Sequence, residues 1–189
     1  MKAKSNLPLC ALVCCLLTVR FGFASEPGLP LVGQPQAFDV KDCTGPAMGK
    51  TLCYFCRYGG RPVVAIFTRQ INDHVGTLVS EIESAVKKHR EQRLAAFLVY
   101  VTKDTPAAEG ALKDIARRFE ITRTPLTILK ESEDALQVKY GIPKETELMV
   151  MMWRGVRVHS NFPVRNASPE KKDVSRVVLG VEQLLEARR

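Results

Sequence analysis

Two stretches of the sequence are continuously apolar and rich in β-branched residues, Pro62–Thr68 and Leu94–Val101. Such runs are typical of strands that are buried on both faces of a parallel sheet. Between them, residues 71–90 place apolar side chains at helical spacing, which predicts an amphipathic helix. A second helix is predicted to begin at Thr105, because Pro106 then occupies the first helical position. The pattern therefore predicts a strand–helix–strand–helix unit with parallel strands.

Further elements are predicted on both sides of this unit. Residues 37–40 form a short strand candidate, and a Gly-Pro turn after it leads the chain back toward the core. Residues 125–129 are a third core strand candidate, and a hairpin is predicted where two apolar stretches flank an Arg-Gly turn at 147–160. A short helical turn is expected at 134–140, and a closing amphipathic helix at 169–187.

The N-terminus has the pattern of a secretory signal peptide spanning residues 1–24. A short basic segment precedes the apolar run Leu7–Val19, and small residues precede a candidate cleavage point near Ala24. The apolar run is short for a membrane span, so we expect contact with a membrane only if this segment stays uncleaved. The expected organisation is an exported protein, periplasmic or secreted, with a flexible lead-in at 25–36 and one domain at 37–189.

Composition and charge narrow the classes of protein that fit. With 46% hydrophobic residues, the chain can form a core that does not depend on disulfides. The formal net charge of +8 falls to +5 without the signal segment, which contains three basic residues and no acidic one. The remaining basic residues alternate with acidic ones, which indicates a solvated surface, and we expect no nucleic-acid partner.

The candidate chemistry is a pair of cysteines. Beyond the signal segment the chain keeps Cys43, Cys53 and Cys56, and the last two have CxxC spacing. Such a pair can close a small disulfide and reopen it, because the second thiolate resolves the mixed disulfide formed by the first. Arg57 and Arg61 follow closely in the sequence, and a nearby guanidinium stabilises a thiolate and lowers its pKa.

The same motif is used in three ways, and the sequence leaves all three open. The pair can be redox-active, it can be a permanent disulfide that holds an N-terminal hairpin, or it can bind a metal. Cys43 can pair with Cys53 or Cys56, or complete a three-cysteine site for zinc or copper(I) with His74 or His159. Alternatively, Cys43 is a buried, small, apolar side chain.

The order of the elements resembles the thioredoxin fold. Three segments are similar to redoxin and peroxiredoxin-type domains, namely Gly33–Val40, Arg61–Phe67 and Tyr140–Ile142 with the hairpin that follows it. Together they cover roughly residues 33–187. The resemblance implies an α/β domain of the thioredoxin-like superfamily, redoxin/peroxiredoxin-like branch. Its central mixed sheet is flanked by helices and carries an N-terminal β-hairpin extension that bears the CxxC.

The sequence departs from these families at the position of the reactive cysteine. In them that cysteine follows the first core strand, where the start of the next helix lowers the thiol pKa. Here residues 68–73 occupy that place and contain no cysteine, so a peroxidase is the least favoured enzyme. The CxxC pair precedes the strand instead, and we expect no helix start beneath it. Pro125 lies in a segment similar to the cis-proline motif, but we expect an ordinary proline at the start of a strand.

The resulting prediction is an exported thiol–disulfide redox protein, a candidate oxidoreductase whose catalytic residues are Cys53 and Cys56. Its expected partner is a protein or small-molecule thiol or disulfide. We assign no cofactor and no metal ligand. The alternatives are a non-catalytic thioredoxin-fold binding protein with a structural disulfide, and a zinc- or copper-binding protein.

Overall fold

The computed structural model describes residues 34–103 and 105–187. The predicted signal segment and residues 25–33 of the lead-in lie outside the described residues. The elements are, in chain order, β1 (Val40–Asp42), β2 (Thr51–Leu52), α1 (Tyr54–Tyr58), β3 (Pro62–Thr68), α2 (Asp73–Lys88), β4 (Ala95–Tyr100), α3 (Thr105–Arg118), β5 (Leu126–Leu129), α4 (Glu133–Tyr140), β6 (Leu148–Arg154), β7 (Arg157–Val164), the 3-10 turn η1 (Arg165–Ala167) and α5 (Lys171–Glu186).

Seven strands form one mixed sheet in the order β2-β1-β5-β4-β3-β6-β7. The three core strands β3, β4 and β5 are parallel, and Val64 of β3 lies opposite Ala96 of β4. The hairpin β6–β7 extends one edge, with β6 antiparallel to β3. The hairpin β1–β2 extends the other edge, with β1 antiparallel to β5. The predicted mixed sheet and N-terminal hairpin are therefore confirmed.

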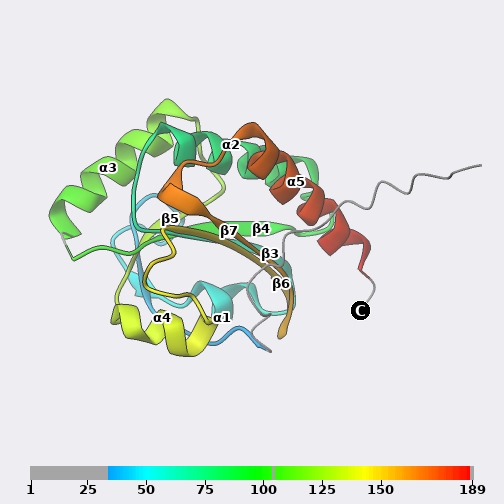
Figure 1. Ribbon diagram of the computed structural model, residues 1–189, viewed down its shortest axis with the longest axis horizontal. Helices are drawn as coiled ribbons and strands as arrows, with labels where there is room; N and C mark the ends of the chain where they lie inside the picture. The colour runs from blue at the N-terminus through cyan, green and yellow to red at the C-terminus, as the bar shows by residue number, and fades with distance from the viewer. Residues whose placement is uncertain (1–33, 104, 188–189) are drawn as a thin grey trace, which may run out of the picture.

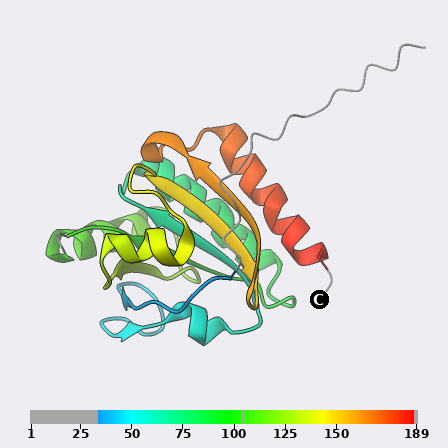
Figure 2. The same cartoon turned by 60° about the horizontal axis from the view of Figure 1, so that its bottom comes forward.

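Helices cover both faces of the sheet, as predicted. In Figure 1 the helices α2, α3 and α5 lie above the sheet, and α1 and α4 lie below it. In Figure 2, α5 (red) at the right edge and α1 (cyan) at the bottom again lie apart. Strand β3 serves both layers, because Val64 and Ile66 pack with the first group of helices while Val63 and Phe67 pack on the α1/α4 side. Burial on both faces explains why this strand is apolar at every position before its last residue, Thr68.

The element bounds differ from the prediction mainly at the edges of the sheet. Strand β1 begins at Val40, where we expected a strand to end, and β7 continues to Val164. Pro163 lies within β7, which is possible because this is an edge strand. No peptide bond in the described residues is cis, so Pro125 is an ordinary trans proline directly before β5. None of the described helices has the length and hydrophobicity of a membrane span.

Candidate functional site

Cys53 and Cys56 form a disulfide at the start of helix α1, with their Cα atoms 5.3 Å apart. Helix α1 follows β2 after one residue, so the hairpin does present the pair. The expectation that no helix starts beneath the pair is wrong, because Cys53 is the N-cap of α1. The Cys56 N–H donates a hydrogen bond to the Cys53 Sγ over 3.1 Å. At five residues, α1 is too short to produce a helical pattern in the sequence.

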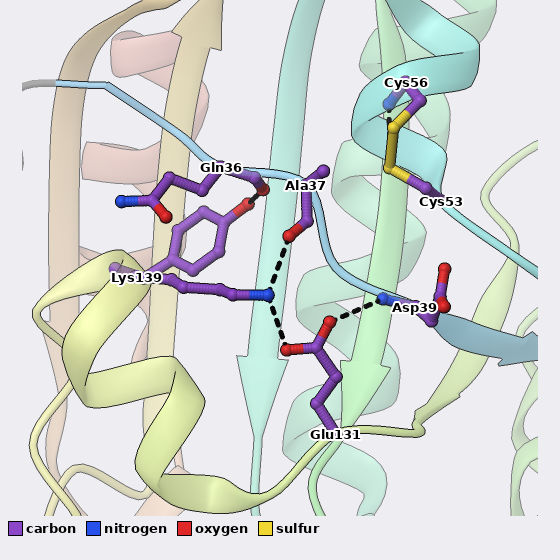
Figure 3. The surroundings of a disulfide bond; sticks show 8 residues. Gln36, Ala37, Asp39, Cys53, Cys56, Glu131 and Lys139 are labelled. Carbon is purple, nitrogen blue, oxygen red and sulfur yellow. Dashed lines mark hydrogen bonds and ion pairs between the residues drawn. A yellow bond between two sulfur atoms is a disulfide. The ribbon is translucent and has the colours of Figure 1, made fainter.

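The two sulfur-bearing residues differ in exposure. Cys56 is exposed, whereas Cys53 is half-buried. In Figure 3 the disulfide lies at one end of α1, and Cys53 is on the side that faces the segment carrying Ala37 and Asp39. A disulfide at the protein surface can be reached by an outside thiolate without opening of the core.

A buried carboxylate holds the hairpin and α1 together. Asp42, at the end of β1, is fully buried, and its Oδ2 accepts a hydrogen bond from the Tyr54 hydroxyl over 2.8 Å. The same carboxylate accepts from the backbone N–H groups of Gly45 (2.7 Å) and Ala47 (2.8 Å) in the hairpin loop. Burial and the hydrogen bond to Asp42 raise the pKa of Tyr54, so its hydroxyl remains a donor. We did not predict this anchor, although an aspartate shortly before a Gly-Pro turn signals such a loop.

Aromatic side chains of α1 pack against the sheet beneath the disulfide. The Tyr54 ring stacks on Phe97 of β4 with centroids 5.4 Å apart, and Tyr58 contacts the same ring at 6.0 Å. Phe55, between the two cysteines, lies 6.2 Å from the ring of Trp153 in β6. Tyr54 is 1% exposed. These rings therefore hold α1 in place, and Tyr54 is not available to a partner.

The segment 36–39 lies beside the site and is held by Lys139 of α4 and by Glu131, which precedes that helix. Lys139 Nζ donates to the Ala37 carbonyl over 2.9 Å and pairs with Glu131 over 2.6 Å. Glu131 also accepts from the Asp39 N–H over 3.2 Å. Figure 3 shows this network, with the segment passing between α4 and α1. The network positions one border of the site on the Cys53 side.

The two predicted thiolate-stabilising residues occupy different environments. Arg57 is exposed in the last turn of α1, one residue after Cys56. The Arg61 guanidinium lies over the Tyr58 ring, 5.7 Å from its centroid. An effect of Arg57 or Arg61 on a thiolate stays a prediction.

The third cysteine is remote from the pair. Cys43 is a free thiol, 1% exposed, and packs in the core on the α2/α3/α5 side of the sheet. Burial, with a smaller effect of Glu109, raises the pKa of this thiol to about 11. The hypotheses that Cys43 pairs with Cys53 or Cys56, or joins them around a metal, are therefore wrong. Within residues 34–103 and 105–187, no group of three His, Cys, Asp or Glu side chains is arranged to hold a metal ion.

Redoxin and peroxiredoxin-type domains carry their reactive cysteine between the strand and helix that correspond to β3 and α2. In this chain that place holds polar side chains and no thiol. Arg69 pairs with Glu133 over 2.8 Å, and its Nε donates to the Thr146 carbonyl over 3.1 Å. Gln70 donates to Glu147 over 2.9 Å. These contacts join the end of β3 to α4 and to the loop before β6, which gives this place a structural role.

Comparison with solved structures identifies the type of fold. No protein-family model matches the sequence, and no curated protein matches it in sequence. Among solved structures, the chain is similar to a candidate thiol:disulfide interchange protein DsbE from Chlorobium tepidum, with a TM-score of 0.63 and 11% identity. That match covers 83% of this chain and 99% of the other.

Two further structures show the same similarity. One is a secreted Mycobacterium tuberculosis disulfide oxidoreductase homologous to E. coli DsbE, with a TM-score of 0.54, 11% identity and coverage of 77% and 95%. The other is the peroxidoxin BcpB from Mycobacterium tuberculosis, with a TM-score of 0.59, 15% identity and coverage of 84% and 99%. At these identities the matches establish the fold, which is thioredoxin-like.

Proposed function

We propose that this protein exchanges thiols and disulfides with a protein or small-molecule partner through Cys53 and Cys56. In the exchange, a partner dithiol becomes a disulfide while the Cys53–Cys56 disulfide becomes two thiols, or the reverse. The observation that carries the proposal is a disulfide between two neighbouring cysteines, one of them exposed, at the edge of a thioredoxin-like domain.

The size of the disulfide loop argues against a purely structural role. The bonded cysteines are only three positions apart in the sequence. Closing so small a loop constrains the unfolded chain little, and the chain-entropy relation gives about 2 kcal/mol for a four-residue loop. A domain with a two-sided core of this size does not depend on such a bond for folding.

The attachment of α1 does not rely on the disulfide either. Tyr54 is held by Asp42 and by the Phe97 ring, and the Tyr58 hydroxyl donates to the Ala96 carbonyl over 3.2 Å. None of these contacts involves a cysteine, so we expect them to remain when the sulfur–sulfur bond is broken. A site that keeps its shape in both redox states can be cycled by a partner without unfolding.

The predicted export is consistent with the same proposal. Residues 1–24 have the pattern of a signal peptide, and an oxidising compartment lets the Cys53–Cys56 disulfide persist. One structurally similar protein is secreted. We propose that the mature chain begins near Ser25, after cleavage at Ala24. The mass of the protein recovered from the culture medium or periplasm tests this, and an intact mass that retains Met1 would contradict it.

A pair of activity assays tests the exchange itself. In one, the protein catalyses the reduction of insulin by dithiothreitol; in the other, the oxidised protein converts a dithiol peptide to its disulfide, mole for mole. We expect both activities in the wild type and in a Cys43→Ala control, because Cys43 is remote from the site. Both should be lost when Cys53 and Cys56 are replaced by serine. Equal activity of the double-serine variant would reject the proposal and favour a binding protein with a structural disulfide.

The protein contains its own reporter of the redox state. Trp153 is the single tryptophan of the chain and packs against Phe55, which lies between the two cysteines. Reduction of the disulfide should therefore change the tryptophan emission. The double-serine variant provides the control, because dithiothreitol should leave its emission unchanged.

A further inference from the structure

We propose that the two sulfurs have fixed and unequal roles: a partner thiolate attacks the Cys56 sulfur, and the Cys53 sulfur is the leaving group. This assignment rests on the proposed exchange function and deepens it. Three observations carry it, namely the exposure of each cysteine, the hydrogen bond at the Cys53 sulfur, and the segment that borders Cys53.

Access favours attack at Cys56. An incoming thiolate must reach the sulfur it attacks from the side opposite the sulfur–sulfur bond, because displacement at sulfur is in-line. Cys56 is exposed and lies within α1. Cys53 is half-buried where β2 joins α1, on the side that faces the segment 36–39 (Figure 3). That segment is fixed by the Lys139 and Glu131 contacts described above, which keeps the border in place.

Leaving-group stability points to the same assignment. The Cys56 N–H already donates to the Cys53 Sγ in the disulfide, over 3.1 Å. A hydrogen bond to the charged form of a group lowers its pKa, and a thiol of lower pKa leaves faster. If Cys53 were attacked, Cys56 would have to leave, and none of the described residues donates a hydrogen bond to the Cys56 sulfur. The Cys56 N–H therefore favours attack at the Cys56 sulfur with Cys53 as the leaving group.

The proposed exchange passes through a mixed disulfide between the partner and Cys56 in both directions. A partner thiolate bonds to the Cys56 Sγ, the Cys53–Cys56 bond breaks, and its electron pair leaves on Cys53 as a thiolate. A second partner thiolate then attacks the partner sulfur in the mixed disulfide, which releases Cys56 as a thiolate and the partner as a disulfide. In reverse, the Cys56 thiolate attacks a partner disulfide, and the Cys53 thiolate resolves the mixed disulfide at Cys56.

Glutathione serves as the probe thiol, and the chain offers a convenient peptide for locating it. Trypsin should release residues 51–57 between Lys50 and Arg57, so both cysteines lie in one short peptide. The oxidised wild-type protein is mixed with reduced glutathione, and excess N-ethylmaleimide stops the reaction at early times. Fragmentation of the peptide between Tyr54 and Phe55 then shows which cysteine carries glutathione and which carries the maleimide.

We expect glutathione on Cys56 and maleimide on Cys53, in about tenfold excess over the opposite arrangement at the earliest times. A majority of glutathione on Cys53, or an even division, would overturn the assignment while leaving the exchange function intact. Complete absence of a mixed disulfide, with the protein disulfide still closed, would overturn both.

Single-cysteine variants give an independent measurement in the Cys43→Ala background. The Cys53→Ser variant keeps Cys56 and should form a stable mixed disulfide with oxidised glutathione. The Cys56→Ser variant keeps Cys53 and should form it about tenfold more slowly when the two variants are compared at a pH where both thiols are ionised, because Cys53 is less exposed than Cys56. Circular dichroism checks that both variants are folded. A Cys56→Ser variant that reacts as fast as Cys53→Ser would contradict the assignment.

Discussion

Replacement of Tyr54 by phenylalanine tests what holds the cysteine-bearing helix in place. The change removes one hydroxyl and keeps the ring, so the stacking on Phe97 and the volume of the core are preserved. What is lost is the 2.8 Å hydrogen bond from the hydroxyl to the buried Asp42 carboxylate. Asp42 keeps its backbone donors in the hairpin loop, including those at Gly45 and Ala47, so the carboxylate is not left without partners.

The expected cost follows from the charge of the acceptor. A hydrogen bond to an ionised group contributes about 1.5–3 kcal/mol, and because backbone donors remain we expect a loss near the lower end, about 2 kcal/mol. Tyr58→Phe is the matched control, because it removes a hydroxyl from the same helix that donates to a neutral carbonyl over 3.2 Å. Its expected cost is about 0.5–1.5 kcal/mol.

Urea denaturation followed by circular dichroism measures both variants with the disulfide closed and after reduction. If Tyr54, and not the disulfide, holds α1, the cost of Tyr54→Phe should be the same in the two redox states. A cost well below that of Tyr58→Phe, or a cost that appears only after reduction, would refute this explanation.

Three further predictions concern other parts of the fold. Burial raises the pKa of Glu83, but hydrogen bonds from the loop before β5 outweigh it and keep the pKa below its ordinary value of 4.5. The stability that ionised Glu83 contributes should therefore be fully present above pH 4.5 and be lost as the pH falls through the lowered pKa. Glu83→Gln should lower the free energy of unfolding by about 1.5–3 kcal/mol near neutral pH. Urea denaturation at a series of pH values should show a weaker loss of stability in acid for this variant than for the wild type. Gly76→Ala should destabilise the protein by about 1–3 kcal/mol, because the added Cβ would lie 2.4 Å from the Phe119 ring. Gly110→Ala has open space around the added Cβ and should stabilise the protein by about 0.5–1 kcal/mol. Thermal melts that rank the two variants in the opposite order would show that the packing argument is wrong. Iodoacetamide at pH 8 should leave Cys43 unmodified in the folded protein and modify it after unfolding in urea, and rapid labelling of the native protein would contradict its burial.

Most of the fold could be predicted because long elements carry repeated signals. The apolar runs that became β3 and β4, and the helical spacing that became α2, each extend over enough residues to identify their type. Burial on both faces of β3 leaves a single polar residue, Thr68 at its end, so the apolar pattern is uninterrupted over the rest of the strand. The shift of β1 to Val40 shows the opposite case, because a three-residue strand offers almost no pattern to place.

The candidate site was only partly predictable for the same reason. CxxC spacing identified Cys53 and Cys56 as a pair, and the structure joins them. Helix α1 was missed because its five residues are held by tertiary contacts and not by helical propensity. The role of Asp42 was missed too, since its partner Tyr54 lies twelve positions later and only the folded hairpin brings them together.

The position of Cys43 could not be derived from spacing along the chain. It lies only ten residues before Cys53, and this proximity in the sequence left a cluster of the three sulfurs open as one alternative. Strand β1 instead directs Cys43 into the core on the α2/α3/α5 side, while α1 packs on the opposite face. A sheet separates the two sites, and only the pairing of β1 with β5 determines this.

The reduction potential of the Cys53–Cys56 disulfide tests the central claim most directly. The Cys43→Ala protein is equilibrated in glutathione buffers of graded ratio, thiols are alkylated, and the oxidised fraction of the peptide 51–57 is measured by mass spectrometry. We predict a potential between about −120 and −270 mV, the range of known exchange proteins. A potential below about −300 mV would mean that the bond resists biological thiols, and it would contradict an exchange function.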